Sequence, residues 1–150
     1  METDENVEIG GYVLRFGVVY FLAVVAVATI LTLLGIESGS SSVIPTVAGT
    51  MAVTMKFLNE NKRLPNASEK KQLIWYSLAV MMLISLVLVI VFLIVVGELG
   101  IFMELLEKAG FGLVFGALLF ATAIELFVLY IGYGWLTNKY YESLLKEGKI

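Results

Sequence analysis

The sequence contains no cysteine and no histidine. The absence of cysteine excludes disulfide bonds and thiol chemistry, and the absence of histidine excludes imidazole acid–base catalysis. The two absences together also remove the ligands on which nearly every transition-metal site depends. We therefore expect no metal, no cofactor and no enzyme active site in this chain.

Charged residues are scarce as well. They make up 15% of the chain, against 59% hydrophobic residues, whereas a soluble domain usually contains about 25% charged residues. A helix needs about 20 apolar residues to cross the hydrocarbon core, where each backbone polar group must find its partner inside the chain. We therefore predict an all-α membrane protein, one integral domain over residues 1–150 that forms a four-transmembrane-helix bundle. The predicted spans cover about 12–35, 43–61, 72–97 and 111–137.

Basic residues are distributed unevenly between the ends of these spans. If the weakly apolar span 43–61 crosses the membrane, every Lys and Arg except Lys108 falls on the side of the N terminus, the central loop and the C terminus. Lys and Arg near span ends are enriched on the cytoplasmic side, so we predict that both termini and the central loop are cytoplasmic. Hydropathy alone leaves a re-entrant segment at 43–61 open.

Two short segments lie outside the predicted spans on the N-terminal half of the chain. The first residues, 1–11, are acidic and lack the basic start of a secretory signal, so we expect them to be retained. The Ser-rich segment 36–43 has no Lys or Arg and predicts a tight exposed loop.

The segment between Gly97 and Gly110 has its own helical pattern. Over residues 101–109 the apolar side chains share one helical face and the charged side chains share the other. This pattern predicts a short amphipathic helix that lies on the outer membrane surface between the third and fourth spans. A helical extension of the flanking spans is the alternative.

The central loop combines a helix-start signal with a basic cluster. Asn66 followed by Glu69 predicts a capping box at the start of the third span. The basic residues set the topology and contact anionic lipid heads, and they are also a candidate cytoplasmic contact surface for a partner. That candidate surface consists of Lys62, Arg63, Lys70 and Lys71.

Glu125 stands near the middle of the fourth predicted span. An ionisable side chain at that depth costs roughly 2.5–3.5 kcal/mol, so we expect Glu125 to face the bundle and to have a partner. Counted from the outer ends of their spans, Glu125 and Lys56 both lie about 20 Å deep, which makes Lys56 the first choice. A structural interhelical bond and a proton- or cation-coupling role both remain open. The other polar candidates are Thr50 and Thr54, then Arg15, with Thr122 on the same helical face as Glu125.

Small residues in the fourth span indicate close helix packing. Gly112 and Gly116 form a GxxxG pair, and Gly132 shares the face of Glu125. Glycines at this spacing let two helix backbones approach closely, either within one chain or in a homodimer.

Several short motifs together give the chain a resemblance to known proteins. They are LRFGVVYFL in the first span, Lys56-Phe57, then Arg63, Pro65 and Glu69 before the third span, and YGWLTNKYY at the end of the fourth. With them the chain resembles an uncharacterised family of small bacterial four-helix inner-membrane proteins. The resemblance implies a bacterial inner-membrane location, and it implies no activity and no catalytic residues.

Two classes of function fit these features. We favour a non-enzymatic protein that binds another protein in or at the membrane, such as an immunity protein against a membrane-targeting toxin, an analogy of architecture alone. The alternative is an oligomeric small transporter or channel subunit that uses Glu125 for proton or cation coupling. The expected partners are the lipid bilayer, a protein toxin or other membrane partner, or further copies of the chain, and we expect no nucleic acid.

Overall fold

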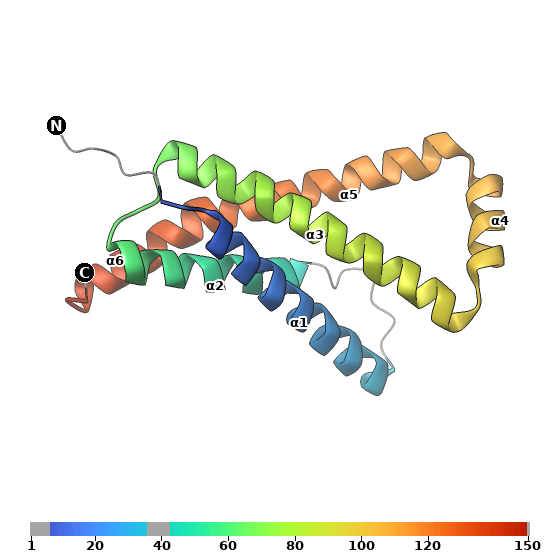
Figure 1. Cartoon of the computed structure of the whole chain (residues 1–150), viewed down its shortest axis with the longest axis horizontal. Coiled ribbons are helices and arrows are strands. Elements are labelled where there is room, and N and C mark those ends of the chain that lie inside the picture. Colours follow the sequence, from blue (N-terminus) through green and yellow to red (C-terminus); the bar gives the residue numbers. More distant parts are fainter. Residues whose placement is uncertain (1–6, 36–42, 150) are drawn as a thin grey trace.

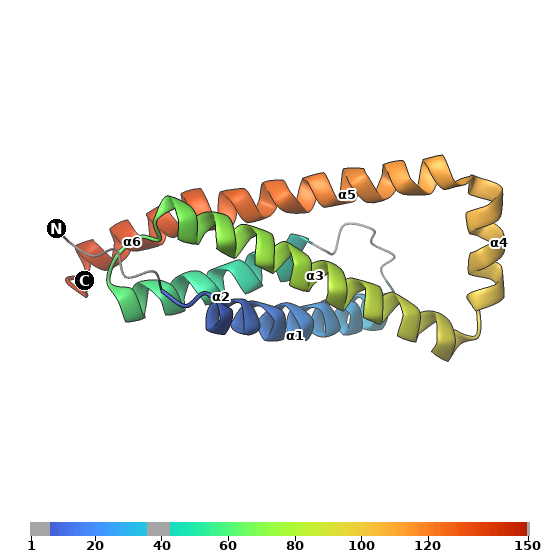
Figure 2. The same ribbon diagram turned by 45° about the horizontal axis from the view of Figure 1, so that its top comes forward.

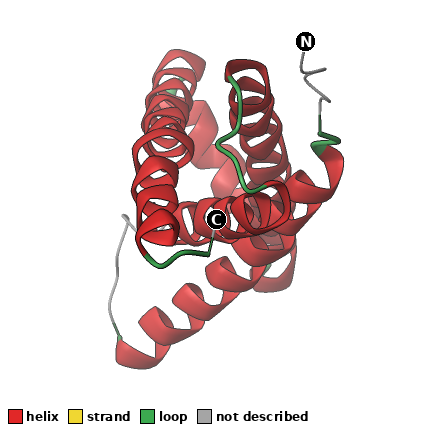
Figure 3. Cartoon of the chain, turned by 90° about the vertical axis from the view of Figure 1, so that its left-hand side faces the viewer, coloured by secondary structure: helices red, strands yellow, loops and turns green. Residues whose placement is uncertain are grey.

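The computed structural model describes residues 7–35 and 43–149, and every regular element in that part of the chain is a helix (Figures 1 and 3). The acidic residues 1–6 and the predicted loop at 36–42 lie outside the described residues. The helices are α1 (Gly10–Leu34), α2 (Val43–Asn61), α3 (Ala67–Val96), α4 (Leu99–Ala109) and α5 (Phe111–Ile131), which continues through the π-helical turn η1 (Gly132–Leu136) into α6 (Thr137–Lys146).

Three of the described helices are long and apolar enough to cross a membrane. They are α1, α3 and the continuous helix formed by α5, η1 and α6. The structure therefore confirms an all-helical protein with the helices of a membrane protein. The second predicted span corresponds to α2, which is shorter, at 19 residues, and is not among the three.

The helices pack tightly at one end of the molecule and diverge toward the other (Figures 1 and 2). We call the packed end the closed end: it contains the starts of α1 and α3, the end of α2, and η1 with α6. The opposite, open end carries α4 and the neighbouring halves of α3 and α5. Viewed from the closed end, α1 crosses the other helices diagonally (Figure 3). The fully buried large side chains include Phe16, Phe57, Leu58, Leu73 and Leu129.

The segment between the third and fourth predicted spans forms a separate helix, α4, and not an extension of α3 or α5. Gly97 and Gly110 have φ angles of 74° and 78°, which glycine adopts at little cost because it has no Cβ. These two turns set α4 crosswise to both neighbouring helices at the tip of the open end (Figures 1 and 2). The sequence pattern thus predicted correctly that a separate helix forms between Gly97 and Gly110.

The capping box predicted at the start of α3 is present. The Asn66 side chain accepts a hydrogen bond of 2.8 Å from the Glu69 amide, and the Asn66 amide donates one of 2.8 Å to Glu69 Oε2. Glu69 does more than cap the helix, because it is only 1% exposed and accepts two further bonds, of 2.8 and 2.7 Å, from the Arg63 guanidinium. The amide of Val7 also donates to Glu69, at 3.4 Å. One carboxylate therefore joins the start of α1, the central loop and the start of α3.

Glycines allow the helices of the closed half to cross at short range. A Cβ at Gly17 would lie 2.9 Å from Val80, and a Cβ at Gly49 would lie 2.8 Å from the Phe16 ring. The first crossing joins α1 to α3, and the second joins α1 to α2. A larger residue at either glycine would push two helices apart, because protein interiors leave little free volume.

The pair formed by Arg63 and Glu69 yields a stability prediction. Arg63→Ala leaves a buried carboxylate without its cation. Because the Arg63 side chain is itself 39% exposed, water screens the pair in part, and we expect the loss to be about 1–3 kcal/mol. The midpoint of thermal unfolding of the detergent-purified protein should then fall by roughly 5 °C. The control is Lys71→Ala, which removes an exposed charge at the same end and should leave the midpoint nearly unchanged. Equal midpoints for the two variants would show that backbone amides alone stabilise Glu69.

Candidate functional site

A line of hydroxyl groups lies along one face of α2 in the interior of the protein. Thr46, Thr50 and Thr54 are spaced by four residues, so they share one face of the helix, and each is at most 3% exposed. The Thr54 and Thr137 hydroxyls lie 3.0 Å apart, and the Thr50 hydroxyl donates to the Thr46 carbonyl at 2.7 Å. At the other end of the line, the Thr46 hydroxyl donates to Glu125 Oε2 at 2.8 Å. We call these five side chains the polar seam.

The π-helical turn η1 brings α5 against the polar seam. A π turn inserts one residue into the helix and re-aims the side chains around it. The Thr137 hydroxyl donates to the Gly132 carbonyl at 3.0 Å, and Tyr133 and Ser77 share a bond of 2.8 Å. Gly132 lies directly against Thr50, where a Cβ would overlap the threonine side chain. Gly132, which the sequence predicted as a packing residue, therefore lies at the contact between α2 and η1.

Glu125 is half-buried and faces the first turn of α2. The N-terminal turn of a helix carries a partial positive charge from its unpaired amides, which stabilises a nearby carboxylate. The Thr46 hydroxyl adds a hydrogen bond of 2.8 Å to the same carboxyl group. The described contact of Glu125 is therefore with a hydroxyl group at a helix start, whereas Lys56 lies beside Glu60.

The predicted ion pair between Glu125 and Lys56 is wrong. Lys56 lies 3.9 Å from Glu60 on its own helix and 5.2 Å from the centre of the Tyr12 ring. The prediction failed because it placed the start of α2 level with the start of α5. Thr46, in the first turn of α2, instead meets Glu125, which lies about 21 Å along α5 from Phe111 at 1.5 Å per residue.

The remaining predicted partners of Glu125 lie elsewhere. Thr50 and Thr54 belong to the polar seam but contact other members of it. Arg15 is exposed on α1. The Thr122 hydroxyl bonds back to the Leu118 carbonyl of its own helix at 2.8 Å.

The predicted glycine pair near the start of α5 makes no contact within the described part of the chain. A Cβ at Gly112 or Gly116 would meet no atom within 4 Å. The expected packing of these glycines inside the chain is therefore not present. Both glycines lie on the exposed outer half of α5.

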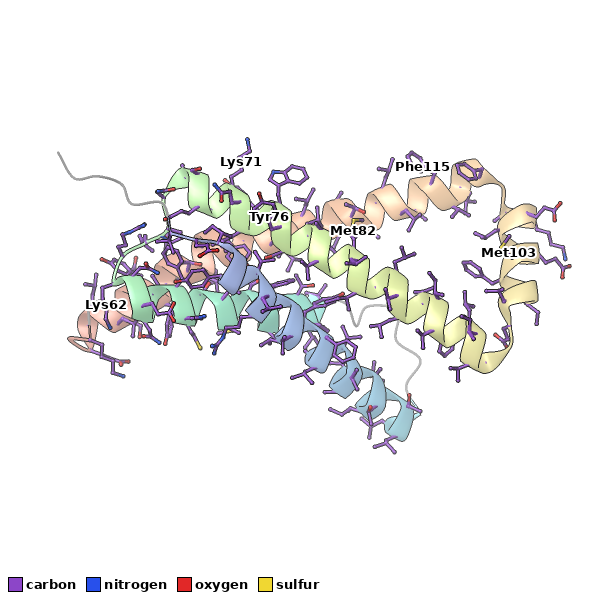
Figure 4. The ribbon with its side chains drawn as sticks, in the orientation of Figure 1. Lys62, Lys71, Tyr76, Met82, Met103 and Phe115 are labelled. Carbon is purple, nitrogen blue, oxygen red and sulfur yellow. The ribbon has the colours of Figure 1, made fainter. Side chains whose placement is uncertain are left out.

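The predicted cytoplasmic basic surface is reduced by internal contacts. Arg63 is engaged with Glu69, and the Lys70 ammonium lies 4.8 Å from the centre of the Tyr130 ring. Lys62 and Lys71 are exposed at the closed end (Figure 4), although the Lys62 ammonium also donates to the Lys149 carbonyl at 3.2 Å. Only these two lysines are left as an open basic surface.

The interhelical contact between Tyr20 and Ser85, and the cavity beside it, are among the features that sequence reasoning missed. The hydroxyls of Tyr20 and Ser85 lie 3.1 Å apart and join α1 to α3. They border a cavity of about 240 Å³ that Pro45 of α2 also lines. In the sequence, Ser85 stands within the long aliphatic run of α3, and this position could have indicated an interhelical contact.

No family model, no curated protein and no solved structure matches the chain. The site is therefore interpreted from its own geometry. Among the described residues, no buried side-chain nitrogen or oxygen lacks a hydrogen-bond partner, and no group of three acidic side chains is placed to hold a metal ion. The polar seam is thus a satisfied network that runs from the closed end to Glu125 and stops there.

The contact between Thr46 and Glu125 yields a second prediction. Thr46→Val keeps the side-chain shape but removes the hydroxyl, so the Glu125 carboxylate loses its hydrogen bond inside the bundle. Leaving a polar group unsatisfied in this way costs about 1–3 kcal/mol, which we expect to see as a lower midpoint of thermal unfolding. The matched control is Thr122→Val, whose hydroxyl bonds only within its own helix.

A second variant tests whether the loss arises from the contact itself. Adding Glu125→Leu to Thr46→Val removes the unsatisfied carboxylate, so part of the lost stability should return. A loss that is equal in Thr46→Val and Thr122→Val, or that Glu125→Leu fails to reduce, would contradict the assigned contact.

Proposed function

We propose that the protein crosses a bacterial inner membrane four times, with both termini in the cytoplasm. The separation of charge supports this orientation: Lys62 and Lys71 lie at the closed end, whereas Lys108 lies in α4 at the open end (Figures 1 and 4). In this arrangement α2 returns the chain to the cytoplasmic side.

In this orientation α4 lies on the outer surface of the membrane. Its crosswise position supports this placement, because a helix that lies across the ends of the spans runs along the membrane surface (Figure 2). Glu104 and Lys108 form an exposed ion pair of 2.7 Å on its polar face. Phe102 and Leu106 are less exposed than these charged residues, as expected for the opposite, apolar face.

We infer that the protein acts by binding another protein in or at the membrane. The observation that carries this inference is the outer half of α5, where Phe111 and Phe120 are 89% and 71% exposed. Lipid tails cover such side chains in a membrane, but the stripe of Gly112 and Gly116 leaves a shallow surface that admits a second helix at close range. A partner of this kind is a helix of a membrane-targeting toxin, which makes the protein an immunity protein.

A second candidate function rests on Glu125. A half-buried carboxylate in the middle of a membrane helix is costly and often marks a proton or ion site. It favours a small transporter or channel subunit that works as an oligomer. The polar seam stops at Glu125, so the described residues of one chain offer no polar pathway through the open end. For this reason we rank transport second.

The proposed topology predicts the accessibility of single cysteines, which can be introduced cleanly because the chain has none. In intact cells a membrane-impermeant maleimide should label Lys108→Cys, which lies outside. It should label Lys71→Cys only after the membrane is permeabilised, because that residue faces the cytoplasm. The reverse pattern, or equal labelling of both variants, would contradict the proposed orientation.

The protein-binding proposal predicts that the glycine stripe is needed for protection. Cells that express the chain should survive a membrane-targeting toxin encoded beside its gene. Gly116→Leu fills the stripe and should lower protection by about tenfold or more, as expected when a close helix contact is lost. The control is Ala117→Leu, which places the same side chain at a neighbouring exposed position. Both variants must accumulate like the natural protein, and equal protection by the two would remove the stripe from the interface.

A further inference from the structure

Lys70, in the first turn of α3, is a half-buried cation at the closed end. The other two half-buried basic side chains in the described part of the chain, Lys56 and Arg63, have a carboxylate oxygen at 3.9 and 2.7 Å. The Lys70 ammonium has no ion pair with a described residue and lies 4.8 Å from the centre of the Tyr130 ring. An aromatic ring attracts a cation but offers no oxygen to its three N–H donors. These donors are therefore open to a ligand.

The position of the Lys70 side chain depends on Gly134 of η1. A Cβ at Gly134 would lie 2.8 Å from Lys70 Nζ and 3.6 Å from its Cε, so the end of the lysine side chain rests on the glycine. The nitrogen can still be reached from outside, because no buried side-chain nitrogen of the described residues lacks a hydrogen-bond partner. The ammonium is thus held between α3 and η1 with its donors accessible.

The surroundings of Lys70 are positive. Glu69, its neighbour in sequence, is already paired with Arg63. The first turn of a helix carries a partial positive charge of its own, which favours an anion at this point. The Lys139 ammonium lies 5.8 Å from the centre of the Trp135 ring, and Trp135 directly follows Gly134. The missing partner of Lys70 is therefore an anion.

Aromatic side chains place this cation at the level of lipid headgroups. Tyr130 and Trp135 are exposed on either side of Gly134, and Trp75 is exposed about one turn after Lys70 on α3. Tyr and Trp are enriched where the membrane meets water, which is the level of the headgroups. One turn before Tyr130, and therefore deeper in the membrane, Phe127 is exposed as well.

These features select one class of ligand. A phosphate group offers oxygen acceptors to the ammonium and neutralises its charge through charge-assisted hydrogen bonds. Free phosphate would leave the exposed aromatic side chains around the site uncovered, whereas the acyl chains of a lipid cover them. A zwitterionic lipid already carries a cation beside its phosphate, so it gains less from Lys70 than a lipid with a net negative charge.

We propose that Lys70, held between α3 and η1, binds the phosphate of an acidic phospholipid. The site lies at the closed end, away from the glycine stripe and from Glu125. It depends only on the helices crossing a membrane, so it stands or falls separately from toxin binding and from transport.

The test measures lipid binding by native mass spectrometry to the full chain purified in an uncharged detergent. We expect phosphatidylglycerol to bind about tenfold more tightly than phosphatidylcholine with the same acyl chains, because only the first carries a net negative charge. Lys70→Gln should remove this preference. The matched control is Lys71→Gln, which removes the same charge from an exposed side chain that extends away from the helices (Figure 4). Because solvent and salt screen that charge, its loss should change the affinity about twofold or less.

Gly134→Ala separates the position of the ammonium from its charge. The new Cβ would displace the end of the Lys70 side chain and leave every charge in the protein unchanged. The displaced atoms are the far end of a flexible side chain, so we expect the midpoint of thermal unfolding to stay close to that of the natural protein. The affinity for phosphatidylglycerol should fall toward that of Lys70→Gln.

Four results would overturn the proposal. They are equal affinity for the two lipids, equal losses in Lys70→Gln and Lys71→Gln, full binding by Gly134→Ala, and displacement of the lipid by an equal concentration of glycerol 3-phosphate. The second would show diffuse attraction to the whole basic end, and the last would show a site for soluble phosphates in place of a lipid site.

Discussion

The buried carboxylate of Glu69 joins three segments that are distant in sequence. It accepts hydrogen bonds from the Arg63 guanidinium, from the Asn66 amide and from the Val7 amide. These hydrogen bonds hold three segments side by side at the closed end: the start of α1, the central loop and the start of α3. The closed end follows from this constraint, and the helices are free to diverge away from it.

The closed end also fixes how far α2 reaches. The Tyr12 hydroxyl donates to Glu60 at 2.7 Å, which holds the end of α2 beside the start of α1. From that point a helix of 19 residues extends about 28 Å at 1.5 Å per residue, which leaves its first turn level with Glu125. The length of α2 and the position of Glu125 are therefore matched, and the carboxylate meets a helix start in place of a basic side chain.

Much of the fold could be predicted from the sequence because its signals are local. Long apolar runs predicted the helices, the spacing of Asn66 and Glu69 predicted the capping box, and Gly97 and Gly110 predicted a separate helix between them. The partner of Glu125 could not be predicted in the same way. Whether two residues on different helices lie at the same depth depends on where each helix starts relative to the other. The helix starts are positioned by packing at the closed end, and no local sequence pattern encodes that packing.

The surfaces on which the two candidate functions rest lie on opposite sides of α5. At 100° per residue, Gly116 points away from the direction of Glu125, nine residues later in the same helix. Glu125 faces the start of α2, whereas the glycine stripe faces outward. A helix bound to the stripe would therefore not cover Glu125. The two activities are therefore separable by substitution, and coupling between them would require that α5 itself moves, since it is the one element common to both sites.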